Sequence, residues 1–159
     1  MLILSIVAAL PMPLMAEAAH PEARPFVETD NVAAKINNAL ALAAKNDKRV
    51  IVILGANWCH DSRALAGWFA TPRFATMLNE RYEIVFIDVG MPQTQNGRNL
   101  DIAHRFGFNK MKSTPLVIVL SSNGQMLNNR KNAISWRNAA SRSENAIFAY
   151  FNNFAVSQK

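Results

Sequence analysis

Cysteine occurs once in this 159-residue sequence, in the stretch Trp58-Cys59-His60-Asp61-Ser62. A single thiol forms no disulfide within its own chain, and it cannot build a thiolate zinc cluster. As a thiolate, however, it attacks disulfides and exchanges thiols between molecules. The residue types and their spacing therefore point first to thiol–disulfide exchange at Cys59.

The sequence around Cys59 changes from a strand pattern to a helix pattern. Residues 50–54 are consecutive branched apolar residues, typical of a central strand buried on both faces, and residues 62–70 carry apolar side chains at helical spacing. Cys59 would then stand at a helix N-terminus, whose free N–H groups and dipole favour an anion. We expect an exposed, reactive thiol there, assisted by a protonated His60 and opposed by Asp61.

Ser62 decides how far that chemistry goes. A dithiol enzyme releases its mixed disulfide when a second thiol attacks the first, and a hydroxyl cannot do this. Release from Cys59 therefore needs an outside thiol, such as glutathione or a substrate cysteine. Ser62 could instead hydrogen-bond the Cys59 thiolate, or cap the helix.

Alternating strands and helices must position this corner. The predicted strands are residues 49–54, 82–89 and 116–120, and a fourth, 125–128, pairs antiparallel with the third after the turn Asn123-Gly124. Parallel strands joined through helices, with a terminal hairpin, predict an α/β fold. Its central mixed β-sheet would carry helices on both faces.

The helices have sequence signals at their ends. We predict helices that begin at caps Asp30 and Asn99, and a final helix that begins at a capping box over residues 141–144. Pro72 should break or kink the helix that follows Cys59. The final helix should bury Ile147, Phe148, Phe151 and Phe154 on one face.

Three separated features resemble the thioredoxin superfamily: Trp58-Cys59 after the first strand, Thr114-Pro115 before the third, and the order of elements over residues 30–154. The sequence has Cys-x-x-Ser where that family has Cys-x-x-Cys. The resemblance implies a thioredoxin-like fold and a cis Thr114–Pro115 peptide bond. It also implies that Cys59 is the nucleophile, with Ser62 beside it in the catalytic motif.

The resemblance further implies a groove for an extended substrate segment, bordered by Trp58, His60, Thr114 and Pro115. Thioredoxin-like enzymes also carry a buried carboxylate in the strand before the motif, and Ile53 stands at the matching place. We therefore expect no proton relay at that position. The stretch 55–59 also looks like the small exported thioredoxin-like proteins of bacteria.

The N-terminus predicts export. Residues 1–18 resemble a signal peptide, because an apolar run ends in Ala16-Glu17-Ala18, although no basic residue precedes the run. The run is shorter than the roughly 20 residues of a membrane span, so we expect no stable span in the mature form and a periplasmic or secreted protein. A buried N-terminal segment of the fold is the alternative. Residues 19–29 are predicted to be a linker, and residues 30–159 one thioredoxin-like domain.

Composition excludes several other functions. The net charge is +6 and the pI about 9.9, but the basic residues are scattered and form no nucleic-acid motif. His20 falls in the linker and His104 in a surface helix, so no spacing supports a copper site shared with Cys59. We expect no cofactor, no metal and no nucleic acid, and a partner that is glutathione or a thiol- or disulfide-containing protein.

Two functions remain open from the sequence. The first is a monothiol oxidoreductase or isomerase that acts through Cys59. The second is a non-catalytic binding module, favoured by Ser62 and Ile53, in which the basic segment 130–142 would contact an acidic partner.

Overall fold

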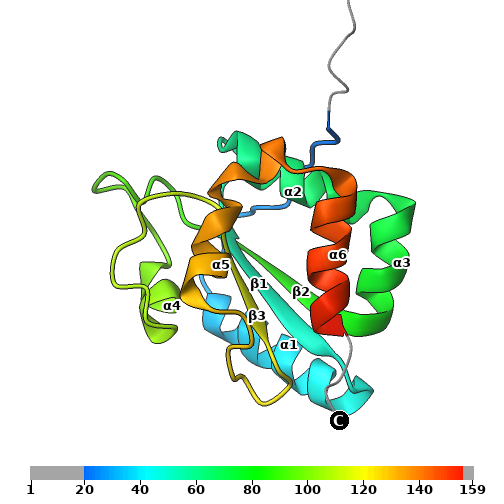
Figure 1. Cartoon of the computed structure of the whole chain (residues 1–159). Helices are drawn as coiled ribbons and strands as arrows, with labels where there is room; N and C mark the ends of the chain where they lie inside the picture. Colours follow the sequence, from blue (N-terminus) through cyan, green and yellow to red (C-terminus); the bar gives the residue numbers. More distant parts are fainter. Residues whose placement is uncertain (1–19, 156–159) are drawn as a thin grey trace, which may run out of the picture.

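The computed structural model describes residues 20–155, so the predicted signal peptide at 1–18 lies outside the described residues. Helical segments separate the first strand from the second and the second from the third, two of them in succession between the first two strands, and further helical segments complete the described chain (Figure 1). In chain order the elements are α1 (Val32–Asn46), β1 (Arg49–Gly55), α2 (His60–Ala70), α3 (Pro72–Arg81), β2 (Tyr82–Asp88), α4 (Leu100–Arg105), β3 (Leu116–Leu120), α5 (Arg130–Ile134), the 3-10 helix η1 (Ser135–Ser141) and α6 (Glu144–Ala155).

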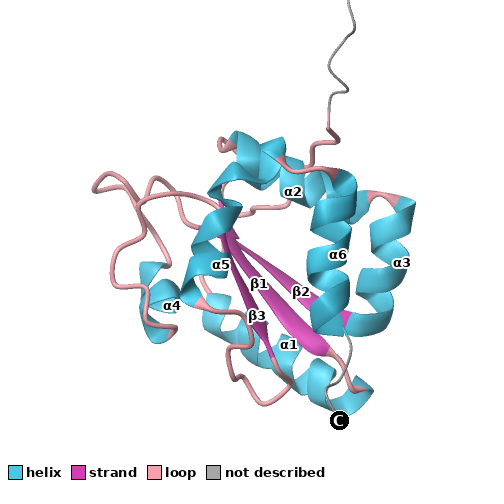
Figure 2. Cartoon of the chain, in the orientation of Figure 1, coloured by secondary structure: helices cyan, strands magenta, loops and turns pink. Residues whose placement is uncertain are grey.

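The sheet has β1 at its centre, in the order β2-β1-β3. β1 pairs parallel with β2, with Ile51 opposite Ile84, and antiparallel with β3, with Ile51 opposite Val119. The mixed sheet predicted from the sequence is confirmed. The connections on either side of α4 are long loops (Figure 2).

The two faces of the sheet carry separate hydrophobic cores because neighbouring strand residues point in opposite directions. Val50, Val52 and Leu54 pack with apolar residues of α1, α4 and α5. Ile51 and Ile53 pack with apolar residues of α2, α3, η1 and α6. Helices therefore cover both faces, as expected.

The predicted fourth strand forms only in part. Residues 125–128 pair antiparallel with β3 at an isolated bridge between Leu120 and Met126, and Leu127 N donates to Val119 O at 2.7 Å, but they form no continuous strand. The Asn128 side chain makes hydrogen bonds to the β3 backbone that a paired strand would otherwise make. Its oxygen accepts from Val119 N at 2.9 Å, and its amide donates to Val117 O at 2.8 Å. A side-chain amide satisfies the edge of β3 where backbone pairing was expected.

Two predicted helix caps are displaced by one or two residues. Asn31, not Asp30, caps α1, since its side chain accepts from Ala34 N at 3.1 Å. The capping box at 141–144 is also wrong, because η1 continues through Ser141; Ser143 instead accepts from Ala146 N at 3.3 Å.

α4 begins directly after Asn99, as predicted, but the side-chain cap is not formed. Asn99 adopts a left-handed conformation and makes no side-chain cap, and its amide donates to Asp88 O at 2.8 Å. Pro72 is the first residue of α3 and so separates α2 from α3, as predicted. The predicted inner face of α6 is borne out, with Ile147 and Phe151 fully buried and Phe148 and Phe154 partly buried.

Residues 20–29 form no helix or strand, but they lie against the end of the molecule that carries the motif at residues 58–62. Ala23 N donates to Arg63 O at 3.1 Å, and the Phe26 backbone exchanges two hydrogen bonds with the Asn57 side chain. A β-carbon on Gly67 would stand 2.1 Å from Pro21 O, so only glycine lets this segment lie so close to α2. Among residues 20–155, no helix combines the length and apolarity that crossing a bilayer requires.

Candidate functional site

The corner between β1 and α2 holds the cysteine. α2 begins at His60, two residues before the predicted start, and Cys59 is its N-cap residue in an extended conformation. Arg63 N donates to Cys59 O at 3.1 Å, and no side chain caps this end of the helix. Asp61 accepts from Ala140 N at 2.9 Å, which ties η1 to the first turn of α2.

The expectation of an exposed thiol is wrong. Cys59 is only 8% exposed, and its Sγ donates to Thr114 O at 3.4 Å. Thr114, near the end of the loop before β3, lies against the thiol and is itself only 4% exposed.

That loop contains the predicted proline. The Thr114–Pro115 peptide bond is cis. The Thr114 hydroxyl is buried and has no hydrogen-bond partner among residues 20–155. A buried hydroxyl without a partner carries a desolvation cost of about 1–3 kcal/mol, which a ligand acceptor could recover.

Ser62 lies in the interior beneath the corner. It is fully buried, and its Oγ accepts from Ala56 N at 3.4 Å. Since α2 already starts at His60, Ser62 does not cap the helix. A β-carbon on Gly55 would meet Ser62 Oγ and the Phe26 ring at 2.7 Å, so this position is closely packed.

Trp58 stands at the surface rather than in the core. Its ring is 47% exposed, and its Nε1 donates to Gly90 O at 2.8 Å. Met91 is 48% exposed and lines the same surface hollow. The corner therefore presents two apolar side chains beside the loop that follows β2.

His60 contacts His20, a residue predicted to lie in the linker. His60 Nε2 lies 2.8 Å from His20 Nε2 and 3.5 Å from Glu22 Oε1. These three side chains come together because residues 20–23 lie on α2. No sequence signal indicates this contact, which joins positions 40 residues apart.

Arg63 is a further site residue that sequence reasoning missed. Its Nε donates to Glu22 Oε2 at 2.9 Å, and its Nη1 donates to Trp58 O at 2.9 Å, so it fastens the N-terminal segment to the corner. The hydrogen bond from Arg63 lowers the pKa of Glu22. The same bond raises the pKa of Arg63, with a smaller contribution from a negative charge on Cys59.

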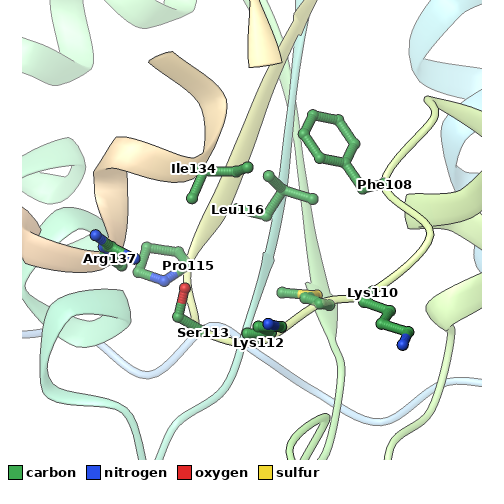
Figure 3. A pocket seen from close by; sticks show the side chains of 9 residues that line it. Phe108, Lys110, Lys112, Ser113, Pro115, Leu116, Ile134 and Arg137 are labelled. Carbon is green, nitrogen blue, oxygen red and sulfur yellow. The ribbon is translucent and has the colours of Figure 1, made fainter. Parts of the chain in front are cut away.

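A small hollow of about 130 Å³ opens next to Pro115 (Figure 3). Pro115, Leu116, Ile134 and Phe108 give it apolar walls. Its remaining lining residues are Ser113, Met111 and the basic residues Lys110, Lys112 and Arg137. An apolar cavity with positive charge around it suits an apolar side chain next to an acidic one.

Comparison with known proteins identifies the fold family. Residues 30–122 match a family model described as thioredoxin-like. The chain belongs to this thioredoxin-like family. The resemblance to the thioredoxin superfamily, and the α/β fold that it implied, are thereby confirmed.

Among solved structures, this thioredoxin-like chain is similar to the disulphide isomerase from Xylella fastidiosa Temecula1. The TM-score is 0.73 and the identity 25%, over 84% of this chain and 98% of the other. No curated protein sequence matches this chain. The individual roles of Cys59, Ser62, Trp58, His60, Thr114 and Pro115 stay predictions.

Proposed function

We propose that this thioredoxin-like protein performs thiol–disulfide exchange through Cys59 as a monothiol, isomerising or releasing disulfides with the help of an outside thiol. The observation that carries the proposal is the position of the thiol. Cys59 occupies the N-cap position of α2 and contacts Thr114, the residue before the cis-proline. The similar solved structure is described as a disulphide isomerase, which supports the same reaction class.

The exchange begins at the sulfur of Cys59. Its thiolate attacks one sulfur of a substrate disulfide, the substrate S–S bond breaks, and the other substrate sulfur leaves as a thiolate. The free N–H groups in the first turn of α2 face the N-cap position, where they stabilise the attacking thiolate. A mixed disulfide between Cys59 and the substrate results.

Release then depends on a thiol from outside the chain, since Ser62 carries a hydroxyl. When a second cysteine of the substrate attacks the mixed disulfide, a rearranged substrate disulfide forms and the Cys59 thiolate is regenerated. When glutathione attacks the Cys59 sulfur, the substrate thiol leaves and Cys59 becomes glutathionylated. A second glutathione then yields glutathione disulfide and free Cys59.

The surface around the thiol supports binding of an extended polypeptide. Trp58 and Met91 offer apolar contact on one side. On the other side, the hollow beside Pro115 would receive an apolar side chain, and Lys112 and Arg137 would attract a neighbouring acidic residue (Figure 3). His60, 59% exposed at the start of α2, would border the same groove.

The deciding experiment follows the mixed disulfide. Wild-type protein is mixed with scrambled ribonuclease and analysed on non-reducing gels, with and without reduced glutathione. We expect a covalent adduct that glutathione dissolves, and recovery of ribonuclease activity. Cys59→Ser is the matched control and should give neither. Equal recovery by wild-type and Cys59→Ser protein would overturn the proposal.

A non-catalytic binding module is the second candidate, favoured by the low exposure of Cys59. Partner capture from an extract with wild-type protein and Cys59→Ala separates the two. Partners that persist without the thiol indicate a binding module. Partners that appear only as reducible adducts indicate exchange.

We also propose that the protein acts after export, on the strength of the apolar leader at 1–18. Expression with its own leader in a Gram-negative host tests this. Recovery from the periplasm, with the N-terminal sequence beginning near Ala19, is the expected result. An uncleaved protein confined to the cytoplasmic fraction would contradict it.

A further inference from the structure

Two histidines and a carboxylate meet beside the thiol corner, from segments far apart in the sequence. One ligand atom from each of His20, Glu22 and His60 can be chosen so that all three lie within 4.8 Å of one another. We propose that these three side chains bind a divalent transition-metal cation, with Cu²⁺ preferred over Zn²⁺.

The spacing of the two ring nitrogens suits one metal geometry better than another. His20 Nε2 and His60 Nε2 are 2.8 Å apart. With metal–nitrogen bonds of about 2.0–2.1 Å, two ligands at right angles stand about 2.9 Å apart, and two tetrahedral ligands about 3.3 Å apart. Right-angle positions belong to tetragonal or octahedral centres, which Cu²⁺ prefers and structural Zn²⁺ does not.

The second ring nitrogen of His20 is arranged as in metal sites. His20 Nδ1 lies 3.3 Å from Pro21 O, so this nitrogen carries the proton when it donates to the carbonyl. Nε2 of His20 is then left with a free lone pair toward His60. A ligating histidine typically donates its second ring N–H to a carbonyl or carboxylate in this way.

Arg63 holds both oxygens of Glu22, and the weaker of the two contacts is on the oxygen that faces His60. Arg63 Nε donates to Glu22 Oε2 at 2.9 Å, whereas Oε1 accepts from Arg63 Nη2 at 3.4 Å and lies 3.5 Å from His60 Nε2. Imidazole and carboxylate together are a common donor set for late first-row metals. Water would fill the other positions, because His60 is 59% and Glu22 37% exposed.

The backbone fixes the two ligands of the N-terminal segment against the third. Pro21 and Glu22 lie directly on Gly67, and Ala23 donates to Arg63 O, so the segment cannot slide along α2 without losing these contacts. The three donors thus come from two anchored pieces of backbone. The cation would fasten residues 20–23 to the start of α2, beside Cys59.

The test uses tag-free protein and a Cys59→Ser variant, so that Cu²⁺ cannot react with the thiol and the result does not depend on the proposed exchange function. Each is titrated with copper sulfate and zinc chloride by calorimetry. Electron paramagnetic resonance reads the ligands of bound Cu²⁺. We expect one Cu²⁺ per Cys59→Ser chain, nitrogen hyperfine splitting from two imidazoles, and at least tenfold weaker Zn²⁺ binding.

Single substitutions assign the ligands in the Cys59→Ser background. His20→Gln and His60→Gln should each weaken Cu²⁺ binding at least tenfold, and Glu22→Gln by a smaller factor. His104→Gln is the matched control, since His104 is the third histidine of the sequence and is exposed on α4. Unchanged binding in His20→Gln and His60→Gln, an equal loss in His104→Gln, or binding that needs Cys59 would each overturn the site and leave the pair as a simple imidazole hydrogen bond.

Discussion

The thiol of Cys59 donates to the carbonyl oxygen of Thr114 across 3.4 Å, and so joins two residues 55 positions apart in the sequence. The contact holds the start of α2 against the loop that enters β3. Thr114 also has a buried side-chain hydroxyl, for which the described residues offer no hydrogen-bond partner. The residue whose carbonyl contacts the sulfur therefore also carries a hydroxyl donor that has no partner among residues 20–155.

Thr114→Val tests whether that donor is used. We expect exchange with a small disulfide to slow by about 10- to 100-fold, because a hydrogen bond to a charged group contributes about 1.5–3 kcal/mol. Stability should stay equal or rise, since the hydroxyl has no partner to lose. Stopped-flow kinetics and urea unfolding measure the two effects. Unchanged exchange together with raised stability would show that the hydroxyl takes no part.

Ser62→Cys should convert the monothiol corner into a dithiol one. Ser62 is fully buried in the first turn of α2, and cysteine is only slightly larger. We expect oxidation to consume both thiols within one chain, and insulin reduction driven by dithiothreitol to increase. Thiol titration after oxidation measures the first effect. Ser62→Ala is the control and should show neither gain; two thiols that stay free under oxidant would contradict the assigned geometry.

Gly67→Ala should detach the N-terminal segment from α2. Alanine is the better helix former by about 1 kcal/mol, yet its β-carbon would stand 2.1 Å from Pro21 O. We expect a net loss of about 1–3 kcal/mol in urea unfolding and faster hydrogen exchange at Ala23. In a chain that begins at Phe26 the same substitution should be neutral or stabilising. Equal losses in the long and the shortened chain would contradict this account.

Asn128→Ala should weaken the fold at the edge of β3. It removes the three side-chain hydrogen bonds of Asn128, to Val119 N, Val117 O and the Tyr150 hydroxyl, and so takes away the side-chain partner of Val119 N–H and of Val117 O. We expect a loss of about 2–4 kcal/mol in the free energy of unfolding. Asn152→Ala, at an exposed position of α6, is the matched control and should change stability little. Similar losses in the two variants would argue against the role of Asn128.

Alkaline pH should destabilise the protein through Tyr82. Burial raises the pKa of Tyr82, whose hydroxyl donates to Phe151 O at 2.5 Å. Above the ordinary tyrosine pKa of about 10, the unfolded chain releases this proton and the folded chain keeps it. Stability is therefore full below pH 10 and falls by up to about 1.4 kcal/mol per pH unit above it.

Urea unfolding of Tyr82→Phe between pH 8 and 11.5 isolates this contribution. The variant should lose some stability at pH 8 with the hydrogen bond, but its stability should fall less steeply above pH 10. Tyr150 is the other tyrosine of the sequence, and burial raises its pKa as well, so Tyr150→Phe serves as the comparison. Parallel curves for wild type and Tyr82→Phe would exclude the assignment.

Much of the fold could be predicted because its strongest signals are local. Residues 50–54 form an unbroken branched apolar run, and they occupy the central strand with partners on both sides. Pro72 can begin a helix but not continue one, and it starts α3. Such features depend on a few neighbouring residues, so the sequence contains them directly.

What escaped prediction depends on tertiary contacts. Pro21 and Pro25 are typical of a linker, and only the folded α2 with Gly67 offers residues 20–23 a surface. Asn128 has low strand propensity, and its use as a ladder partner requires β3 to be in place. The low exposure of Cys59 likewise depends on its contact with Thr114, which lies 55 residues away in the sequence.

The side-chain amide of Asn128 also limits pairing of β3 with a strand of a second copy of the protein. β3 is an edge strand, and an open edge offers its free N–H and C=O groups to a strand of another molecule. Here Leu127 N and the two ends of the Asn128 amide occupy Val119 O, Val119 N and Val117 O. One short segment thus occupies three backbone groups of a strongly apolar edge strand, which leaves a second copy of the chain fewer donors and acceptors to pair with there.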